Sequence, residues 1–351
     1  MPNATNTVTT PPWLAEMMFT DNQKKLLQLL GDGHFHSGTH LAQILHISRS
    51  AVWKHLQSFA ELGIEVHAIN GKGYRLSRPI TLLSANAITS RLDSPTKHLI
   101  AKLEIFDQLD STNTYLMNHA RKSNASGHIC LAEYQSSGKG RRGRTWVSPF
   151  AGNIYLSILW RFQLGLSALG GLSLVVGVAV VRALKKLGIS GVGLKWPNDI
   201  YWQDKKLGGI LIEVIGESEG PCSAVIGLGL NVYLPLNTTA SIQQPWIDLE
   251  QILGEIPIDR NQLTATLLNE LIPILELFST ENLPSYLEEW RSYDCMLNKA
   301  VTFHLPKQTL KGVVKGINQD GLLLLTTEQG EIRTFASGEL SFSPFSHETI
   351  A

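Results

Sequence analysis

An uncharged run of 18 residues, Leu164 to Val181, restricts the folds open to this chain more than any other feature. Its sequence, LGLSALGGLSLVVGVAVV, is at the short limit for a membrane span and contains four glycines. Ser167 can cap a helix that continues to about Lys186, and Gly188 can end it. We therefore predict a helix buried in a large α/β core, and no membrane association.

Size and charge narrow the class of protein. The chain has 351 residues, and single cores rarely grow beyond about 250–300 residues, so two or three domains are expected. Its 30 basic and 30 acidic residues cancel, which excludes a histone-like coat of positive charge.

Cys130, Cys222 and Cys295 lie far apart, which argues against a disulfide framework and indicates a reducing cytoplasm. Residues 1–20 have no signal-peptide pattern and are predicted to be a disordered tail.

Residues 21–79 have the layout of a winged helix-turn-helix domain. A short amphipathic helix is followed by two helical patterns that break at His46-Ile47-Ser48, with Ser37 or Thr39 and then Ser48 as caps. The segment IEVHAINGKGYRLS then alternates around an Asn-Gly pair, which predicts a hairpin. Three helices and a hairpin in this order are typical of DNA-binding domains.

The second helix of the pair has a polar face opposite its apolar stripe. We expect DNA contacts from this face and the hairpin: Ser48, Arg49, Ser50, Lys54, His55 and Lys72. Trp53 is expected to pack against the core or another helix, and not to contact a base. Residues 21–78 hold seven basic and four acidic groups, a net charge of +3, which favours DNA mildly. A protein-interaction module with a solvated helical face is the alternative.

The densest signal is Gln135 to Trp146, QSSGKGRRGRTW. Its glycine spacing matches the bare dinucleotide fingerprint, but no helical period follows and Ser148-Pro149 come soon after, so a Rossmann turn is disfavoured. Four cations and three glycines in residues 138–144 repel one another, which predicts a loop that is poorly ordered until an anion binds. A solvated basic loop or a nucleic-acid contact is the alternative.

A second motif is KWPNDIYWQDKKLGGILIE at residues 195–213. Two glycines entering the strand LGGILIEV indicate close approach by a ligand or another backbone. Lys206 at the start of that strand is a candidate point charge for a phosphate or an activated carboxylate, and Asp199 could hold Mg²⁺. Surface roles for these lysines are the alternative.

Two shorter segments add polar and flexible elements. Asp110-Ser-Thr-Asn113 offers donors and acceptors for a compact polar ligand, or a helix cap at Ser111 or Thr112. The strand IGLGLN ends at Asn231 and suits contact with a flat base.

The four histidines between residues 34 and 46 match no zinc spacing. From about residue 298 short strands alternate with turns, which predicts a small β-barrel.

Together these motifs resemble the bifunctional biotin–protein ligases and biotin-operon repressors of bacteria, over nearly the whole chain after residue 20. The resemblance is carried by FHSGTHLAQILHISRSAVWKHLQ, GKGYRL, DSTN, AEYQSSGKGRRGRTW, KWPNDIYWQDKKLGGILIE and IGLGLN. The family usually has an arginine where this chain has Lys139, so the charge is kept and the forked donor is lost.

The resemblance implies an α+β protein: a winged helix-turn-helix at 21–79, a class II synthetase-like α/β ligase domain at 80–297, and an SH3-like β-barrel at 298–351. It implies that biotin and ATP form biotinyl-5′-AMP and diphosphate. A lysine of the biotin carboxyl carrier protein domain of acetyl-CoA carboxylase would then accept the biotinyl group. An adenylate-bound homodimer would repress biotin-synthesis genes by binding operator DNA.

The resemblance also implies roles for individual residues. Biotin or the adenylate would be bound by Ser111, Thr112, Asn113, Gln135, Gly138, Lys139, Gly140, Arg141, Lys206 and Gly209. The ATP side would include Trp146, Lys195, Asn198 and Asn231, and charge neutralisation during catalysis would come from Lys206, Arg141 and Asp199 with Mg²⁺. A lipoate-type ligase and a non-catalytic, biotin-sensing repressor remain as alternatives.

Overall fold

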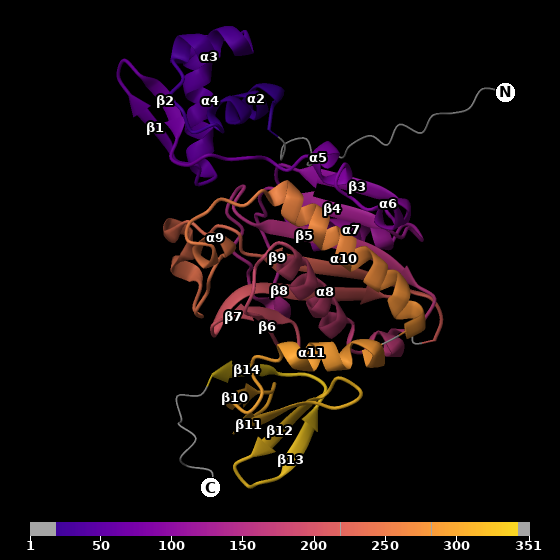
Figure 1. The fold of residues 1–351 in the computed structure, drawn as a ribbon. Helices are drawn as coiled ribbons and strands as arrows, with labels where there is room; N and C mark the ends of the chain where they lie inside the picture. The colour runs from indigo at the N-terminus through magenta and orange to yellow at the C-terminus, as the bar shows by residue number, and fades with distance from the viewer. Residues whose placement is uncertain (1–18, 218, 282, 343–351) are drawn as a thin grey trace, which may run out of the picture.

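The structure is a computed structural model that describes residues 19–217, 219–281 and 283–342. A helical unit with a hairpin, a central sheet covered by helices, and a β-rich unit follow one another along the chain and in space (Figure 1). The tail expected at residues 1–20 lies outside the described residues except for its last two. This order agrees with the α+β architecture expected from the sequence.

The N-terminal unit is the predicted three helices and a hairpin. Its elements are α2 Asp21–Leu30, α3 Gly38–Leu45, α4 Arg49–Glu61, β1 Val66–Ile69 and β2 Gly73–Leu76. Ser37 and Ser48 accept hydrogen bonds from backbone N–H groups of the first turns of α3 and α4, as predicted for the caps. His46 ends α3 in the left-handed conformation, with φ 53°. The apolar stripe of α4, with Val52, Leu56 and Phe59, is buried.

Trp53 does not pack into this core. Its side chain is 55 % exposed on α4, so the expectation of a packing role was wrong. The reason is helical geometry: Val52, Leu56 and Phe59 already cover the inner face of α4, and Trp53 points away from that stripe.

The central unit is built on a seven-stranded sheet. Its strands are β3 Lys102–Phe106, β4 His128–Ala132, β5 Ile154–Phe162, β6 Val192–Lys195, β7 Asp199–Trp202, β8 Lys205–Ile215 and β9 Cys222–Leu230. Their order is β3-β4-β5-β9-β8-β7-β6, and all neighbouring pairs are antiparallel except β3 and β4. Short 3₁₀ turns lie at Arg141–Gly143, Leu166–Leu169, Leu236–Ser241 and Leu283–Tyr286.

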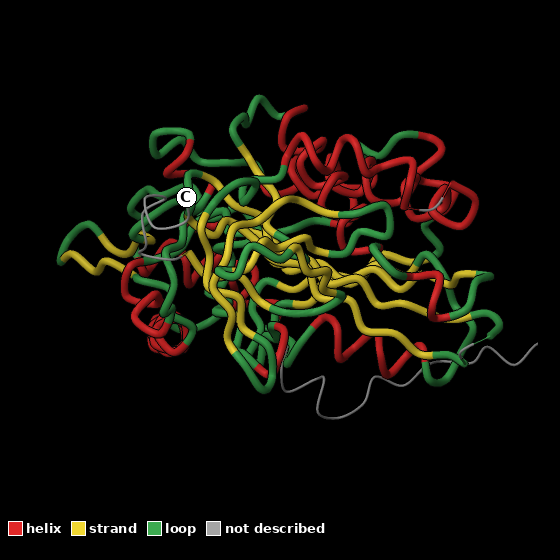
Figure 2. The backbone as a smooth tube through the Cα atoms, turned by 90° about the horizontal axis from the view of Figure 1, so that it is seen from below, coloured by secondary structure: helices red, strands yellow, loops and turns green. Residues whose placement is uncertain are grey.

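Helices cover both faces of this sheet, as Figure 2 shows. They are α5 Ala85–Thr89, α6 Ser94–Leu99, α7 Thr112–Ala120, α8 Leu172–Lys186, α9 Leu249–Ile252, α10 Arg260–Glu281 and α11 Leu287–Tyr293. Ile158 of β5 and Ile226 of β9 share a core with α8 and α10. Their neighbours on the same strands, Leu159 and Val225, pack instead with Leu116 of α7. Because side chains alternate along a strand, α7 lies on the opposite face from α8 and α10.

The uncharged run forms the buried helix that the sequence predicts. The segment 166–186 is long and apolar enough to cross a membrane. However, 61 % of its most apolar 18-residue stretch is buried inside the protein. The helix α8 begins at Leu172 after Gly171, and Ser167 lies in the preceding 3₁₀ turn, so the predicted cap was wrong. Gly188 ends the helix as expected, with φ +79° and its N–H bonded to the Lys185 carbonyl at 2.9 Å.

The C-terminal unit is an antiparallel five-stranded sheet in the order β13-β12-β11-β10-β14. Its strands are β10 Ala300–His304, β11 Thr309–Ile317, β12 Leu323–Thr327, β13 Ile332–Phe335 and β14 Glu339–Phe342. Its core is continuous with that of the central unit. The indole N–H of Trp196 donates to the Gly321 carbonyl at 3.0 Å, and its ring lies 6.3 Å from that of Phe303.

The helix-turn-helix unit is fixed to the central unit by an aromatic contact and two ion pairs. Phe150 of the central unit is 7 % exposed and belongs to the core of the helix-turn-helix unit, with its ring 5.2 Å from that of Phe19. Lys24 pairs with Asp107 at 2.9 Å, and Arg78 pairs with Glu250 at 2.7 Å.

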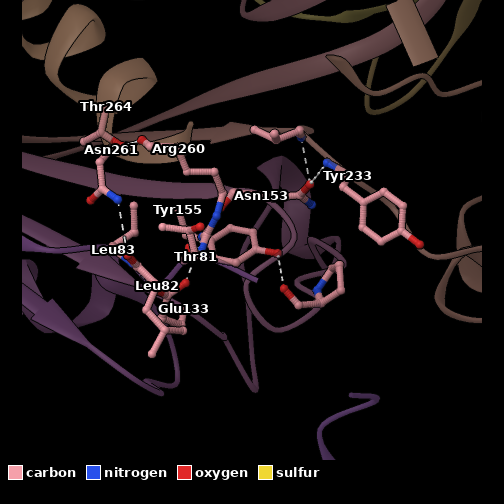
Figure 3. A network of polar contacts seen from close by, with 12 residues as sticks. Thr81, Leu82, Leu83, Glu133, Asn153, Tyr155, Tyr233, Arg260, Asn261 and Thr264 are labelled. Carbon is pink, nitrogen blue, oxygen red and sulfur yellow. Dashed lines mark hydrogen bonds and ion pairs between the residues drawn. The ribbon is translucent and has the colours of Figure 1, made fainter. Parts of the chain in front are cut away.

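A buried polar network holds the segment that connects these two units (Figure 3). The Arg260 guanidinium lies 2.8 Å from the Glu133 carboxylate and donates to the Thr81 carbonyl at 2.9 Å. The other Glu133 oxygen accepts the N–H of Leu83 at 2.5 Å, and Asn261 donates to the Leu82 carbonyl at 3.2 Å. Residues 81–83 are therefore held by side chains that the sequence analysis did not single out.

Candidate active site

A cavity of about 110 Å³ opens among the start of α7, residues 139–146, the β6–β7 turn, strands β8 and β9, and the start of β14. Most of the residues assigned to the ligand site line this cavity: Ser111, Thr112, Asn113, Gln135, Lys139, Gly140, Arg141, Trp146, Lys195, Asn198, Asp199, Lys206 and Gly209. Segments more than 200 residues apart in the sequence therefore meet at one place.

Two of the assigned residues do not line it. A Cβ at Gly138 would lie 2.6 Å from the Trp146 carbonyl oxygen, so this glycine permits the close packing of the loop on itself. Asn231 is 5 % exposed, and its amide donates to the Ile247 carbonyl at 3.1 Å. In the structure Asn231 therefore supports the backbone beside the cavity, and its contact with a flat base stays a prediction.

The glycines of the IGLGLN strand make room for cavity side chains. A Cβ at Gly227 would overlap the Asn113 amide, and one at Gly229 would lie 2.5 Å from the Trp146 indole. The indole therefore rests directly on the backbone of β9. Its N–H is buried and has no hydrogen-bond partner among the described residues, which leaves it free to donate to a ligand.

One end of the cavity is a closed hydrogen-bond network. Gln135 Oε1 accepts from the Thr112 N–H at 2.9 Å, and the Ser157 hydroxyl donates to Asn113 Oδ1 at 2.6 Å. The Asn113 amide donates to Glu213 at 2.9 Å. Ser111 also accepts from the Thr114 N–H at 3.4 Å as the cap of α7, so the capping interpretation of Ser111 is confirmed. These oriented amides and hydroxyls suit a compact polar ligand group with both donors and acceptors.

The other end of the cavity is cationic. Lys206 Nζ lies 2.8 Å from one oxygen of Asp199, and Lys195 Nζ lies 3.9 Å from the other. Arg141 donates to Asn198 at 2.8 Å. Burial lowers the pKa of Lys195, which the Asp199 carboxylate partly offsets, and burial likewise lowers the pKa of Arg141. Three cations against one carboxylate leave a positive field that suits a phosphate chain.

The glycine–arginine loop is a tight hairpin in the structure, and its poor order in the absence of an anion stays a prediction. Gly140 N–H donates to the Arg144 carbonyl at 2.7 Å, and Gly143 adopts φ +74°. Glu339 of β14 forms an ion pair with Arg144 and lies 3.8 Å from Arg142. Burial raises the pKa of Glu339, but the hydrogen bond and charge of Arg144 outweigh it, so the net shift is downward. This carboxylate offsets part of the positive charge of the loop, at Arg142 and Arg144.

Ser157, Glu213, Tyr155 and Glu339 are among the residues in or beside this site that the sequence did not identify. Ser157 and Glu213 are polar residues within the mostly apolar segments IYLSILWRF and LGGILIEV, and that exception was the available signal. Tyr155 lines the cavity from a buried strand, and Glu339 reaches it from the C-terminal unit. Their positions depend on long-range packing that no local pattern displays.

Asp199 offers limited support for a metal ion. The described residues contain no group of three His, Cys, Asp or Glu side chains that could hold one. Mg²⁺ in nucleotide sites usually takes one or two carboxylates and completes its shell with phosphates and water. Asp199 fits such a site as a single protein ligand.

The residues assigned to DNA contact divide into two groups. Arg49, Ser50, Lys54 and Lys72 are exposed. The Ser48 hydroxyl is engaged as the cap of α4, where it accepts the Ala51 N–H at 3.1 Å. His55 is half-buried on α4.

Comparison with known proteins places this architecture in a family. The chain matches the Biotin/lipoate A/B protein ligase family over residues 105–231, an HTH domain over 22–75 and the Biotin protein ligase C terminal domain over 296–343. Bifunctional ligase/repressor BirA of Escherichia coli is 41 % identical over 317 residues, which cover 90 % of this chain and 96 % of that protein. The chain belongs to this ligase/repressor family. BirA of Bacillus subtilis is 30 % identical and covers 88 % of this ligase/repressor chain.

A solved structure supports the same assignment. The biotin protein ligase of Aquifex aeolicus in complex with biotin and ATP is 28 % identical and superposes with a TM-score of 0.58. The match covers 69 % of this ligase/repressor and 98 % of the Aquifex chain.

Proposed function

We propose that this chain activates biotin with ATP to biotinyl-5′-AMP and diphosphate, and transfers the biotinyl group to a lysine of the biotin carboxyl carrier protein. One observation carries the proposal: a single cavity joins a buried network of amides and hydroxyls to a cluster of cations. The first matches the ureido ring of biotin, and the second matches a carboxylate facing the phosphates of ATP. Membership of the ligase/repressor family supports the same reaction.

The polar end orients biotin. Asn113 and Gln135, buried and held by their own hydrogen bonds, shape the end of the cavity that we assign to the ureido group. Their positions are fixed before the ligand binds, so little entropy is lost in aligning the biotin carboxylate toward the cationic end. Trp146 on the glycine floor covers the apolar part of the substrate and has a free indole N–H.

The cationic end performs the chemistry mainly by charge neutralisation. A biotin carboxylate oxygen forms a bond to the α-phosphorus, and the bond to the departing diphosphate breaks. Lys206 and Arg141 reduce the repulsion between the two anions and stabilise the charge that develops on the phosphoryl oxygens. In the second step a lysine amine of the carrier protein attacks the acyl carbon, and AMP leaves with its phosphate still facing the same cations.

Mg²⁺ completes the proposed site. Asp199 would supply its protein ligand, and the metal would neutralise charge on the departing diphosphate. The carboxylate must then share its oxygens between the metal and Lys206.

The repressor half of the proposal uses the helix-turn-helix unit. We propose that the adenylate-bound chain forms a homodimer and places two α4 helices on the half-sites of an operator. Exposed Arg49, Lys54 and Lys72 supply contacts to DNA. Because the unit has a net charge of only +3, binding by a single copy should be weak, and pairing two half-sites would raise the affinity.

An exchange assay separates the candidate activities. Radiolabelled diphosphate should enter ATP when biotin is present, and not when lipoate replaces it. Exchange with lipoate alone would favour a lipoate-type ligase. Absence of exchange together with biotin-dependent DNA binding would favour a non-catalytic sensor. Operator binding should rise with biotin plus ATP and fall with salt, since phosphate contacts are screened.

A further inference from the structure

The exposed indole of Trp53 has no evident role in stability. The side chain is 55 % exposed in the middle of α4, while Val52, Leu56 and Phe59 fill the core of the unit. Tryptophan usually buries most of its large apolar surface on folding, so a half-exposed one on an outer helical face calls for a partner. None of the catalytic residues contacts it, since it lies in the helix-turn-helix unit.

Its neighbours on the helix are hydrogen-bonding side chains. Arg49, Trp53 and Gln57 are spaced by four residues and form one row along α4, and Ser50 and Lys54 form the adjacent row. All five are exposed. An apolar ring therefore stands in the centre of a cationic and polar surface on the helix that corresponds to the recognition helix.

The other side of Trp53 borders the hairpin. A groove of about 420 Å³ separates α4 from β1, with Leu56, Ala60, Ile64 and Val66 among its lining residues and Trp53 at its edge. The indole thus lies between the polar rows of α4 and the β1–β2 hairpin, which is the wing of the winged helix. A DNA duplex is the occupant that this surface favours, because cations flank the ring and an apolar protein partner would leave Arg49 and Lys54 facing an apolar surface.

We infer that Trp53 is a specificity-determining residue that contacts a thymine methyl group in the major groove. This rests on the proposed DNA binding of the helix-turn-helix unit. Arginine reads guanine and glutamine reads adenine through paired hydrogen bonds, so Arg49 and Gln57 can supply polar readout. The thymine 5-methyl group is the apolar feature of the major groove, and in this row Trp53 is the side chain that matches it.

The test begins with selection of a binding site. Full-length protein with biotin and ATP is used to select sequences from a randomised 40-base-pair duplex library, in parallel with Trp53→Ala. Each thymine of the preferred wild-type site is then replaced by deoxyuridine, which removes the methyl group and keeps the base pair. For the wild type, at least one such replacement per half-site should weaken binding about fourfold, the factor expected for burial of one methyl group.

The variant should show the complementary behaviour. Trp53→Ala should bind thymine- and deoxyuridine-containing duplexes equally and should no longer select thymine at that position. Lys54→Ala is the matched control from the adjacent row: it should weaken binding to all sequences and lower the salt dependence, while thymine selection persists. Thermal unfolding should show Trp53→Ala to be as stable as the wild type, since the removed ring is half in water.

The outcomes separate the inference from the proposal beneath it. If the wild type enriches no sequence in the presence of biotin and ATP, DNA binding by this protein is refuted, and the role of Trp53 with it. If the wild type selects a site but every deoxyuridine replacement is neutral, or Trp53→Ala keeps the same methyl preference, the thymine contact alone is refuted.

Discussion

Replacing Phe150 with alanine should loosen the helix-turn-helix unit from the central unit. Phe150 and Trp146 lie four residues apart on one segment, yet Trp146 rests on the cavity floor and Phe150 belongs to the core of the helix-turn-helix unit. Phe150→Ala removes the aromatic contact to Phe19. It does not alter the preceding buried residues, Ser148 and Pro149.

The loss of docking free energy follows from the burial of Phe150 and from the contacts that remain between the two units. Truncating a buried phenylalanine costs about 3–5 kcal/mol, and at 7 % exposure Phe150 belongs in this class. Since the lost contact lies between units, we take the lower value, about 3 kcal/mol, as a loss of docking free energy. That corresponds to roughly a hundredfold shift toward the undocked arrangement. The partly exposed Lys24–Asp107 pair contributes little, so the remaining contacts would centre on Arg78, which pairs with Glu250 and lies 3.5 Å from the ring centre of Tyr233.

Limited proteolysis and hydrogen exchange would measure this shift. Cleavage within residues 77–80 should accelerate, and the Ala151 amide, which donates to the Glu133 carbonyl at 2.9 Å, should lose protection. Phe150→Leu is the control, because it keeps most of the apolar volume and should cost less than about 1.5 kcal/mol. If Phe150→Ala matches Phe150→Leu in both measurements, the aromatic contact does not carry docking and the argument fails.

Four further predictions concern the reaction, the repressor and the pH dependence of stability. Lys206→Ala should slow biotinyl-5′-AMP formation about a hundredfold or more while ATP binding changes less, as single-turnover kinetics would show. Arg141→Gly should release the adenylate into solution, which filtration of the protein away from free adenylate would detect. Deletion of residues 1–78 should abolish operator binding and leave diphosphate exchange measurable. The KM for biotin should rise, because Phe150 loses the apolar residues of the helix-turn-helix unit that pack on it. Burial raises the pKa of Asp294 to about 6 from its ordinary 3.8, so its neutral form favours folding and that stability is lost as pH rises through 6. Asp294→Asn should therefore raise the melting temperature at pH 8 and change it little at pH 4.

The features that the sequence predicted well are those set by neighbouring residues. Ser37 and Ser48 cap helices because a hydroxyl there reaches an N–H three residues later, and this needs no tertiary information. The hairpin around Asn70-Gly71 has the same local origin, with Gly71 at φ +79°. Helix α8 was predictable in its buried character, although its first turn depends on a left-handed Gly171 that a serine-cap pattern concealed.

The features that could not be predicted depend on partners distant in sequence. The glycine–arginine loop gains a partner in Glu339, almost 200 residues away, which pairs with Arg144. Trp53 was misplaced because a helical pattern identifies the buried stripe but does not say whether a neighbouring aromatic residue will find another partner. Gly227 and Gly229 leave space on β9, but only the fold identifies Asn113 and Trp146 as the side chains that occupy it.

Residues 139–150 contact all three units of the protein. Arg144 pairs with Glu339 of the C-terminal unit, Arg141 donates to Asn198 beside the cavity, and Phe150 lies in the core of the helix-turn-helix unit. A substrate phosphate that competes with Glu339 for Arg144 would act on the contact with the C-terminal unit. A substrate that shifts Trp146 would act, four residues later, on the contact with the DNA-binding unit. Residues 139–150 would therefore connect occupancy of the cavity to the arrangement of both flanking units, as the proposed control of DNA binding by the adenylate requires.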